Sequence, residues 1–187
     1  MPKSNSSAIL DLMGLDGQDI VVSRRDGKVV IRKFRKRRKS KSPKRKETND
    51  NFRDANRWAK RILIQPGMKA LYEKGINAKK KNAHTVAVTD YLNAPNIAYV
   101  KLTEYTGTPG DPIRIKATDD FQVVSVKVKV TDGKGQLLEE GEAERYSRKP
   151  FMWVYKATAT NANLASTEIR VIAKDRPGNK KEASSKK

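Results

Sequence analysis

Residues 123–130 read VVSVKVKV, and this stretch decides how the C-terminal half of the chain folds. Its valines alternate with Ser125, Lys127 and Lys129, which gives the period of two that is typical of a half-buried β-strand. The same alternation recurs on both sides, in IRIKA (113–117), EGEAERY (140–146), FMWVYKATAT (151–160) and EIRVIAKD (168–175). Short strands about ten residues apart, separated by turn residues and by no helix, predict an antiparallel β-sandwich.

The alternation also predicts which side chains face the core of this sandwich. Lys127 and Lys129 should face water, because neighbouring residues of a strand point to opposite faces. The expected inward set is apolar throughout: Ile113, Ile115, Ala117, Val124, Val126, Val128, Val130, Trp153, Tyr155, Ile169, Val171 and Ala173.

Three local features of this half resemble a bacterial immunoglobulin-like domain. They are an A-x-D turn at Ala117–Asp119, a Trp/Tyr strand at Trp153–Tyr155, and an A-x-D-x-x-G-N ending at Ala173–Asn179. The resemblance implies an immunoglobulin-like β-sandwich over residues 97–182. It implies no function, because one fold serves many activities.

Residues 24–46 form the most basic stretch, with fourteen Lys or Arg and one acid, Asp26. This is a net charge of +13 out of +20 for the whole chain. At its start, the β-branched runs Ile20–Val22 and Val29–Ile31 flank Asp26–Gly27, and Asp-Gly between such runs favours a tight hairpin turn. The following residues 35–47 contain no apolar side chain and predict a disordered basic arm.

Helical signals begin at Thr48–Asp50, where capping residues precede apolar residues at helical spacing. Pro66 suits the first turn of a second helix. A third helix capped by Asn82 is one prediction for residues 82–92, and a strand through the TVAV run is the other.

The predicted fold is therefore mainly β. A C-terminal antiparallel immunoglobulin-like sandwich follows a basic hairpin, a disordered basic arm and two to three short helices. The expected parts are a flexible N-terminus (1–17), the hairpin and arm (18–47), a helical region (48–96), the sandwich (97–182) and a flexible tail (183–187).

The whole chain also resembles small Bacteroidota-type proteins of uncharacterised function that carry a basic N-terminal hairpin. Gly14, Gly17, Gly27, Lys28 and Arg32 carry this resemblance.

The basic stretch predicts a polyanionic partner, because like charges packed this closely repel one another and disfavour compaction. Nucleic acid phosphate is the first candidate, and contact with it would be largely independent of base sequence. An acidic protein surface in a multi-subunit or phage-like particle is the second, and a solubilising arm is the third. The candidate binding residues are Arg24, Arg25, Lys28, Arg32, Lys33, Arg35, Lys36, Arg37, Arg38, Lys39, Lys41, Lys44, Arg45 and Lys46.

Two further patterns have a functional and a structural interpretation. The helical region has the order of a helix-turn-helix with Arg53, Arg57, Lys60 and Arg61 on phosphate, but its third segment offers few side chains that read bases. The loop residues Asp119, Asp120, Asp175 and Asn179 suit either a hard cation or ordinary turns. We expect ordinary turns at these positions and therefore no metal site.

The composition argues against an enzyme. Because there is no cysteine, neither a thiolate nucleophile nor a cysteine zinc site is possible. His84 is the only histidine. No Gly-rich phosphate loop or paired-carboxylate motif is present. We therefore expect a non-enzymatic protein without cofactors. Since no apolar run approaches the length of a membrane span and the N-terminus makes a poor secretory signal, we also expect it to be soluble and cytoplasmic.

Overall fold

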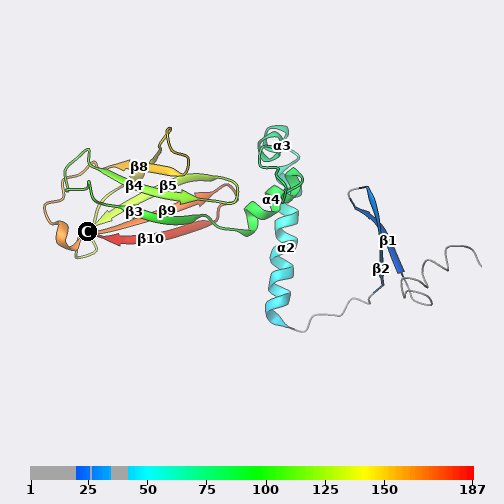
Figure 1. Ribbon diagram of the computed structural model, residues 1–187. Coiled ribbons are helices and arrows are strands. Elements are labelled where there is room, and N and C mark those ends of the chain that lie inside the picture. Colours follow the sequence, from blue (N-terminus) through cyan, green and yellow to red (C-terminus); the bar gives the residue numbers. More distant parts are fainter. Residues whose placement is uncertain (1–19, 26, 35–41) are drawn as a thin grey trace, which may run out of the picture. The chain divides into compact units, whose positions relative to one another are not determined.

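The computed structural model describes residues 20–25, 27–34 and 42–187. This part of the protein is mainly β, with antiparallel sheets and three helices (Figure 1). The chain divides into two compact units, residues 1–45 and 46–187. Within the described residues, none of the helices combines the length and the apolar character that crossing a membrane requires.

The first unit contains the predicted hairpin. Strand β1 (Ile20–Arg25) pairs antiparallel with β2 (Lys28–Lys33), and the register places Arg25 opposite Lys28. Two residues therefore close the turn, and the second of them, Gly27, has φ +77°. This left-handed conformation suits glycine and explains why an Asp-Gly pair stands here. The hairpin prediction is confirmed.

Three helices follow: α2 (Pro43–Ile62), α3 (Pro66–Glu73) and α4 (Ala83–Leu92). Helix α2 begins at Pro43, whereas the sequence predicts a disordered arm through residue 47. That prediction is wrong for residues 43–47, because proline fits the first turn of a helix and the Lys and Arg that follow are good helix formers. The Asn82 side chain accepts a hydrogen bond from the Thr85 backbone N–H at 2.8 Å, so the third segment is the capped helix.

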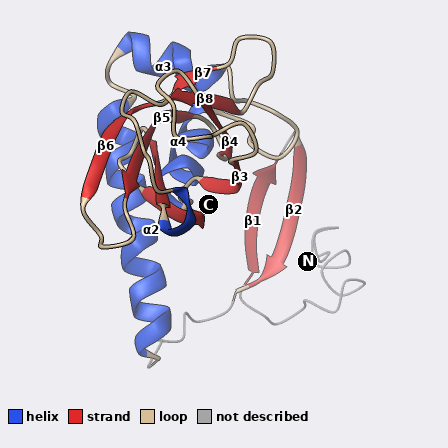
Figure 2. Ribbon diagram, turned by 90° about the vertical axis from the view of Figure 1, so that its left-hand side faces the viewer, coloured by secondary structure: helices blue, strands red, loops and turns tan. Residues whose placement is uncertain are grey.

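The helices share a small apolar core of their own. Trp58 lies edge-on to the ring of Tyr72, with centroids 6.1 Å apart. In Figures 1 and 2 the N-terminal half of α2 extends away from the other two helices. The buried members of this core are Ala55, Ala59, Tyr72, Ala83, Val86, Ala87 and Val88.

Eight strands make a two-sheet body. One antiparallel sheet has the strand order β3-β4-β8-β7 and the other β10-β9-β5-β6. The strands are β3 (Asn96–Lys101), β4 (Pro112–Thr118), β5 (Val123–Thr131), β6 (Leu137–Glu142), β7 (Glu144–Arg145), β8 (Met152–Lys156), β9 (Glu168–Asp175) and β10 (Lys180–Lys186).

One apolar core is enclosed by both sheets and contains the predicted inward residues with one exception. Val124 is 44% exposed, and its neighbour Val123 is buried in its place. The register between β5 and β9 shifts between Val123 and Ser125. The extra residue of such a bulge reverses the alternation locally, so the strict period of two assigns Val124 to the wrong face.

Two other segments differ from the expected pattern. Residues 140–146, predicted as one strand, belong to two: β6 ends at Glu142, β7 starts at Glu144, and these strands lie in different sheets. The chain changes sheets at the buried Ala143. At the C-terminus, where the sequence predicts a flexible tail from residue 183, β10 pairs with β9 as far as Lys186.

The helical region and the two-sheet body meet through a few specific contacts. Phe121, in the turn between β4 and β5, stacks on Tyr72 of α3 with centroids 4.6 Å apart. The Asn179 side-chain amide donates to the backbone carbonyl of Tyr91 at 3.1 Å. These contacts bring the end of α4 against two turns of the body, and this junction holds the second of the two sites described below.

Candidate functional site

The two faces of the hairpin carry different mixtures of basic and apolar side chains. Directly paired residues of antiparallel strands point to the same face, so the register decides which side chains lie together. One face, which we call the basic face, carries three cations beside Ser23 and two valines: Arg25, Lys28 and Arg32. The opposite face carries Ile20, Val22, Val29 and Ile31 together with Arg24 and Lys33, and we call it the apolar face because four of its six side chains are apolar.

Both faces are largely open to solvent. Val22 is 60% and Val29 58% exposed, and Arg25, Lys28 and Arg32 are all exposed. A two-stranded hairpin is at best marginally stable in water without a partner surface. The hairpin therefore needs a partner surface for its stability, and its basic face holds three cations on one two-stranded ribbon.

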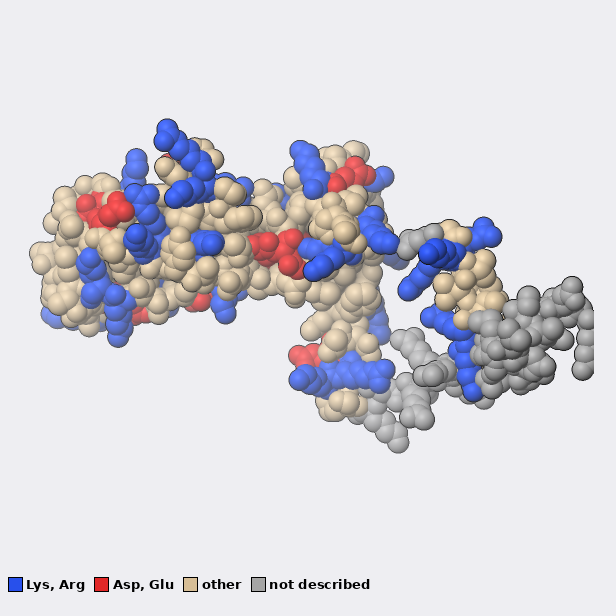
Figure 3. All heavy atoms as spheres, viewed as in Figure 1, with Lys and Arg blue, Asp and Glu red and all other residues tan. Residues whose placement is uncertain are grey.

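A second basic group lies at the start of α2. The helix begins with Lys44, Arg45 and Lys46 directly after Pro43, and all three side chains are exposed. Its first turn contains no acidic residue. Lys and Arg side chains gather at this end of the helix in Figure 3. The positive end of the helix dipole lies there too, so these charges destabilise the free helix and would be relieved by an anion.

The predicted binding residues divide between described and undescribed parts of the chain. Arg35, Lys36, Arg37, Arg38, Lys39 and Lys41 lie outside the described residues. The two remaining groups are Arg24, Arg25, Lys28, Arg32 and Lys33 on the hairpin, and Lys44, Arg45 and Lys46 on α2.

The helical region does not have the form of a base-reading motif. Only Leu92 of α4 is exposed, so this helix has no free face for a DNA groove. Arg53 and Arg57 form ion pairs with acids one turn earlier on α2, at 3.1 Å and 3.3 Å. These features disfavour the helix-turn-helix interpretation, and the helices form a packed region beside the body.

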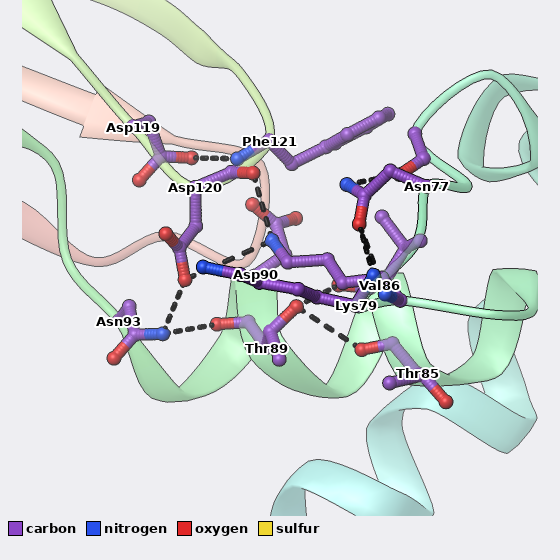
Figure 4. Close-up of polar contacts among 12 residues, drawn as sticks. Asn77, Lys79, Thr85, Val86, Thr89, Asp90, Asn93, Asp119, Asp120 and Phe121 are labelled. Atoms are coloured by element: carbon purple, nitrogen blue, oxygen red, sulfur yellow. Dashed lines mark hydrogen bonds and ion pairs between the residues drawn. The ribbon is translucent and has the colours of Figure 1, made fainter.

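The junction between the helices and the body contains a carboxylate cluster. Asp90 comes from α4, Asp119 from the turn after β4, and Asp175 from the end of β9. One carboxylate oxygen of each lies within 4.8 Å of the others. Asp90 is 0% and Asp175 1% exposed, and Figure 4 shows Asp90 directed from α4 toward the turn that carries Asp119.

Turn geometry accounts for part of this cluster. Asp119 Oδ2 accepts the backbone N–H groups of Phe121 and Gln122 at 3.2 Å and 3.0 Å. Asp175 Oδ1 accepts those of Gly178 and Asn179 at 2.8 Å and 2.6 Å. These are the ordinary turn roles that the sequence suggests for both aspartates.

Asp90 is held by a different partner. Its Oδ2 accepts the Tyr72 hydroxyl at 2.6 Å. Burial raises the pKa of Asp90 to about 7, and the hydrogen bond from Tyr72 opposes this. The charge of Asp119, a hydrogen bond between the Asp90 side chain, when protonated, and that of Asp119, and the charge of Asp175 add to the rise. Burial likewise raises the pKa of Asp175, against the hydrogen bonds that it accepts. The pKa of the Tyr72 hydroxyl is raised by burial and then by Asp90.

The sequence anticipates this cluster only in part. Asp120, expected with the other loop acids, is exposed and instead accepts a hydrogen bond from the Asn93 amide, with Lys80 3.8 Å away (Figure 4). Asp90 is missing from the sequence prediction, because nothing in the α4 segment indicates that its one acid lies against two distant turns. Its position on the same helix face as the apolar residues Val86 and Ala87, four and three residues earlier, was the available signal.

Comparison with known proteins adds little to this geometry. No protein-family model matches the chain, and no curated protein matches it significantly. Among solved structures, the crystal structure of CopC from Methylosinus trichosporium OB3b is similar at 13% identity, covering 48% of this chain and 87% of that one, with a TM-score of 0.36. A likeness this weak supports neither a shared fold nor a shared function.

Proposed function

We propose that this protein binds nucleic acid without catalysing a reaction, and that its basic hairpin and arm contact phosphates with little sequence preference. The concentration of fourteen Lys and Arg in residues 24–46 carries the proposal. Each contact with a phosphate releases counterions, so a few such contacts give strong, salt-sensitive affinity that does not depend on base sequence.

The hairpin offers a shape as well as charge. A two-stranded ribbon fits the major groove of a DNA duplex. Arg25, Lys28 and Arg32 share one face of this ribbon and can approach neighbouring phosphates together. Ser23 is the only uncharged polar side chain on that face, which favours contact with the backbone over base reading.

The first turns of α2 support the same partner. Lys44, Arg45 and Lys46 follow the arm directly and are exposed. Their charges, together with the positive end of the helix dipole, create an anion-binding end that continues the basic stretch.

For the two-sheet body we propose an immunoglobulin-like sandwich. In that fold, strands A, B, E and D form one sheet and C, F and G the other. If the strands are lettered in the order in which they follow along the chain, the first sheet reads A-B-E-D, from β3, β4, β8 and β7. The second sheet then contains C, F and G, which are β5, β9 and β10. Strand β6 then extends the second sheet beside β5. The body would serve as a stable support or as a second contact surface.

The test compares two variants of the full chain that lose the same charge. The first removes the basic face by Arg25→Gln, Lys28→Gln and Arg32→Gln. The matched control removes three exposed lysines of the body by Lys134→Gln, Lys149→Gln and Lys156→Gln.

Binding to random-sequence duplex DNA and to RNA is measured by fluorescence anisotropy at several salt concentrations. Each lost phosphate contact makes the slope of log Kobs against log salt shallower by about 0.9 on DNA. We expect the hairpin variant to lose up to about 2.7 of slope and the control to keep the slope of the unaltered chain. Equal slopes for the two variants would reject the hairpin as the binding element.

A structural or assembly protein is the alternative, and the apolar face of the hairpin favours it. Phosphate contacts would leave Val22 and Val29 exposed, whereas a neighbouring subunit with an acidic, partly apolar surface would cover them. Light scattering of nuclease-treated protein at high salt separates the two functions. An oligomer that persists there supports assembly, and a monomer supports nucleic acid binding.

A further inference from the structure

Two oxygens of the carboxylate cluster have no hydrogen-bond partner among the described residues. They are Asp90 Oδ1 and Asp119 Oδ1, and both are buried. The turn roles of Asp119 and Asp175 use other oxygens, and Tyr72 uses the other oxygen of Asp90. A buried carboxylate oxygen without a partner is costly, so either a shared proton or a bound cation has to satisfy these two oxygens.

The Lys and Arg side chains that the structure describes do not satisfy these two oxygens. Arg176 donates from Nη2 to the Gln122 side chain at 3.1 Å, and the Lys80 ammonium donates to the Asp120 backbone carbonyl at 2.9 Å. Within the described ranges, no Lys or Arg forms an ion pair with Asp90, Asp119 or Asp175. Three carboxyl groups therefore converge without an ion pair to a described Lys or Arg, although the charge of Arg176 is near enough to lower the pKa of the Tyr72 hydroxyl.

We propose that Asp90, Asp119 and Asp175 bind a divalent hard cation, Ca²⁺. All three ligands are carboxylate oxygens, which Ca²⁺ prefers, and no nitrogen or sulfur ligand belongs to the cluster. Oxygens bound to one Ca²⁺ at 2.3–2.6 Å lie within about 5 Å of one another, and one oxygen of each of the three aspartates meets this condition.

The ion would have a structural role. Asp119 also lines a cavity of about 280 Å³, together with Phe121 and Arg145. Bound Ca²⁺ would tie α4 to the turn after β4 and to the end of β9. It would therefore fix the helical region on the body, independently of what the basic hairpin binds.

The experiment uses the full chain after treatment with a chelator. Ca²⁺ is titrated while the melting temperature is recorded, and Tb³⁺ luminescence excited through the aromatic side chains reports direct binding, since Trp58 and Tyr72 lie beside the cluster. The variants are Asp90→Asn and Asp119→Asn. Asp120→Asn is the matched control, because Asp120 is the neighbour of Asp119 but is exposed and outside the cluster.

We expect the unaltered chain and Asp120→Asn to melt roughly 5–10 °C higher when Ca²⁺ is about 100-fold above its Kd. Both should sensitise Tb³⁺, and excess Ca²⁺ should displace it. Asp90→Asn and Asp119→Asn should lose both responses while keeping a folded circular dichroism spectrum.

The proposal is overturned if millimolar Ca²⁺ changes neither signal, or if the cluster variants respond like Asp120→Asn. It is also overturned if the cluster variants are more stable in chelator while the unaltered chain ignores Ca²⁺. The two carboxylates then share a proton instead of a cation. If Asp90→Asn fails to fold, Asp119→Asn decides the question through Tb³⁺ luminescence.

Discussion

Replacing Asp90 by asparagine should change how stability depends on pH in metal-free buffer. The folded chain holds the pKa of Asp90 at about 7, against an ordinary value of 3.8, chiefly because the side chain is buried. Between these two values the folded state binds more protons than the unfolded state, so stability falls as pH rises. At about 1.4 kcal/mol per pH unit, the loss between pH 4 and pH 8 approaches roughly 4 kcal/mol.

Asparagine has nearly the same shape and stays neutral. Its carbonyl can accept the Tyr72 hydroxyl, and its amide can donate to Asp119 Oδ1, which has no partner among the residues described. We therefore expect Asp90→Asn to match the unaltered chain at pH 4 and to exceed its stability at pH 8 by up to about 4 kcal/mol.

The assay is urea denaturation with a chelator present, at several pH values, followed by the fluorescence of Trp58 and Trp153. Asp120→Asn is the control and should show no pH-dependent difference from the unaltered chain. A difference between Asp90→Asn and the unaltered chain that stays constant from pH 4 to pH 8 would refute the reasoning, as would a loss of stability at pH 8.

Two predictions concern packing and a buried acid. A Cβ at Gly75 would lie 2.7 Å from the Val86 side chain, so Gly75→Ala should lower the free energy of unfolding by about 1–3 kcal/mol. Gly67→Ala is the control and should be neutral or stabilising, because no atom lies within 4 Å of a Cβ placed there. Glu139 Oε2 accepts four hydrogen bonds. Glu139→Gln should therefore lower the free energy of unfolding, measured by urea denaturation, by roughly 1–3 kcal/mol. Glu140→Gln should lower it much less, because Glu140 is exposed. Equal effects of the two substitutions would contradict this.

Local sequence patterns predicted the elements whose conformation depends on neighbouring residues in the chain. The Asp-Gly pair between two β-branched runs predicted the hairpin, and the register and Gly27 confirm it. Alternating valines predicted β5 and its buried face, because burial on one face of a strand imposes that period. Only Val124 is misplaced, since a bulge depends on the pairing partner as well as on the strand itself.

Features that depend on distant contacts could not be predicted. The change of sheet at Ala143 depends on which strands pair, and the alternation of residues 140–146 is the same in either case. The carboxylate cluster is the clearest example. Asp119 and Asp175 stand in turns that attract attention, but Asp90 lies on a helix, and only the packing of α4 on the body brings it beside them.

The salt dependence of nucleic acid binding tests the central claim most directly. The full chain is titrated onto random-sequence duplex DNA between about 50 and 200 mM salt, where contact with several phosphates changes affinity by orders of magnitude. We predict a straight line of log Kobs against log salt with a steep negative slope, limited to about −13 if all fourteen cations of residues 24–46 contact phosphate. A slope near zero would contradict the proposed function.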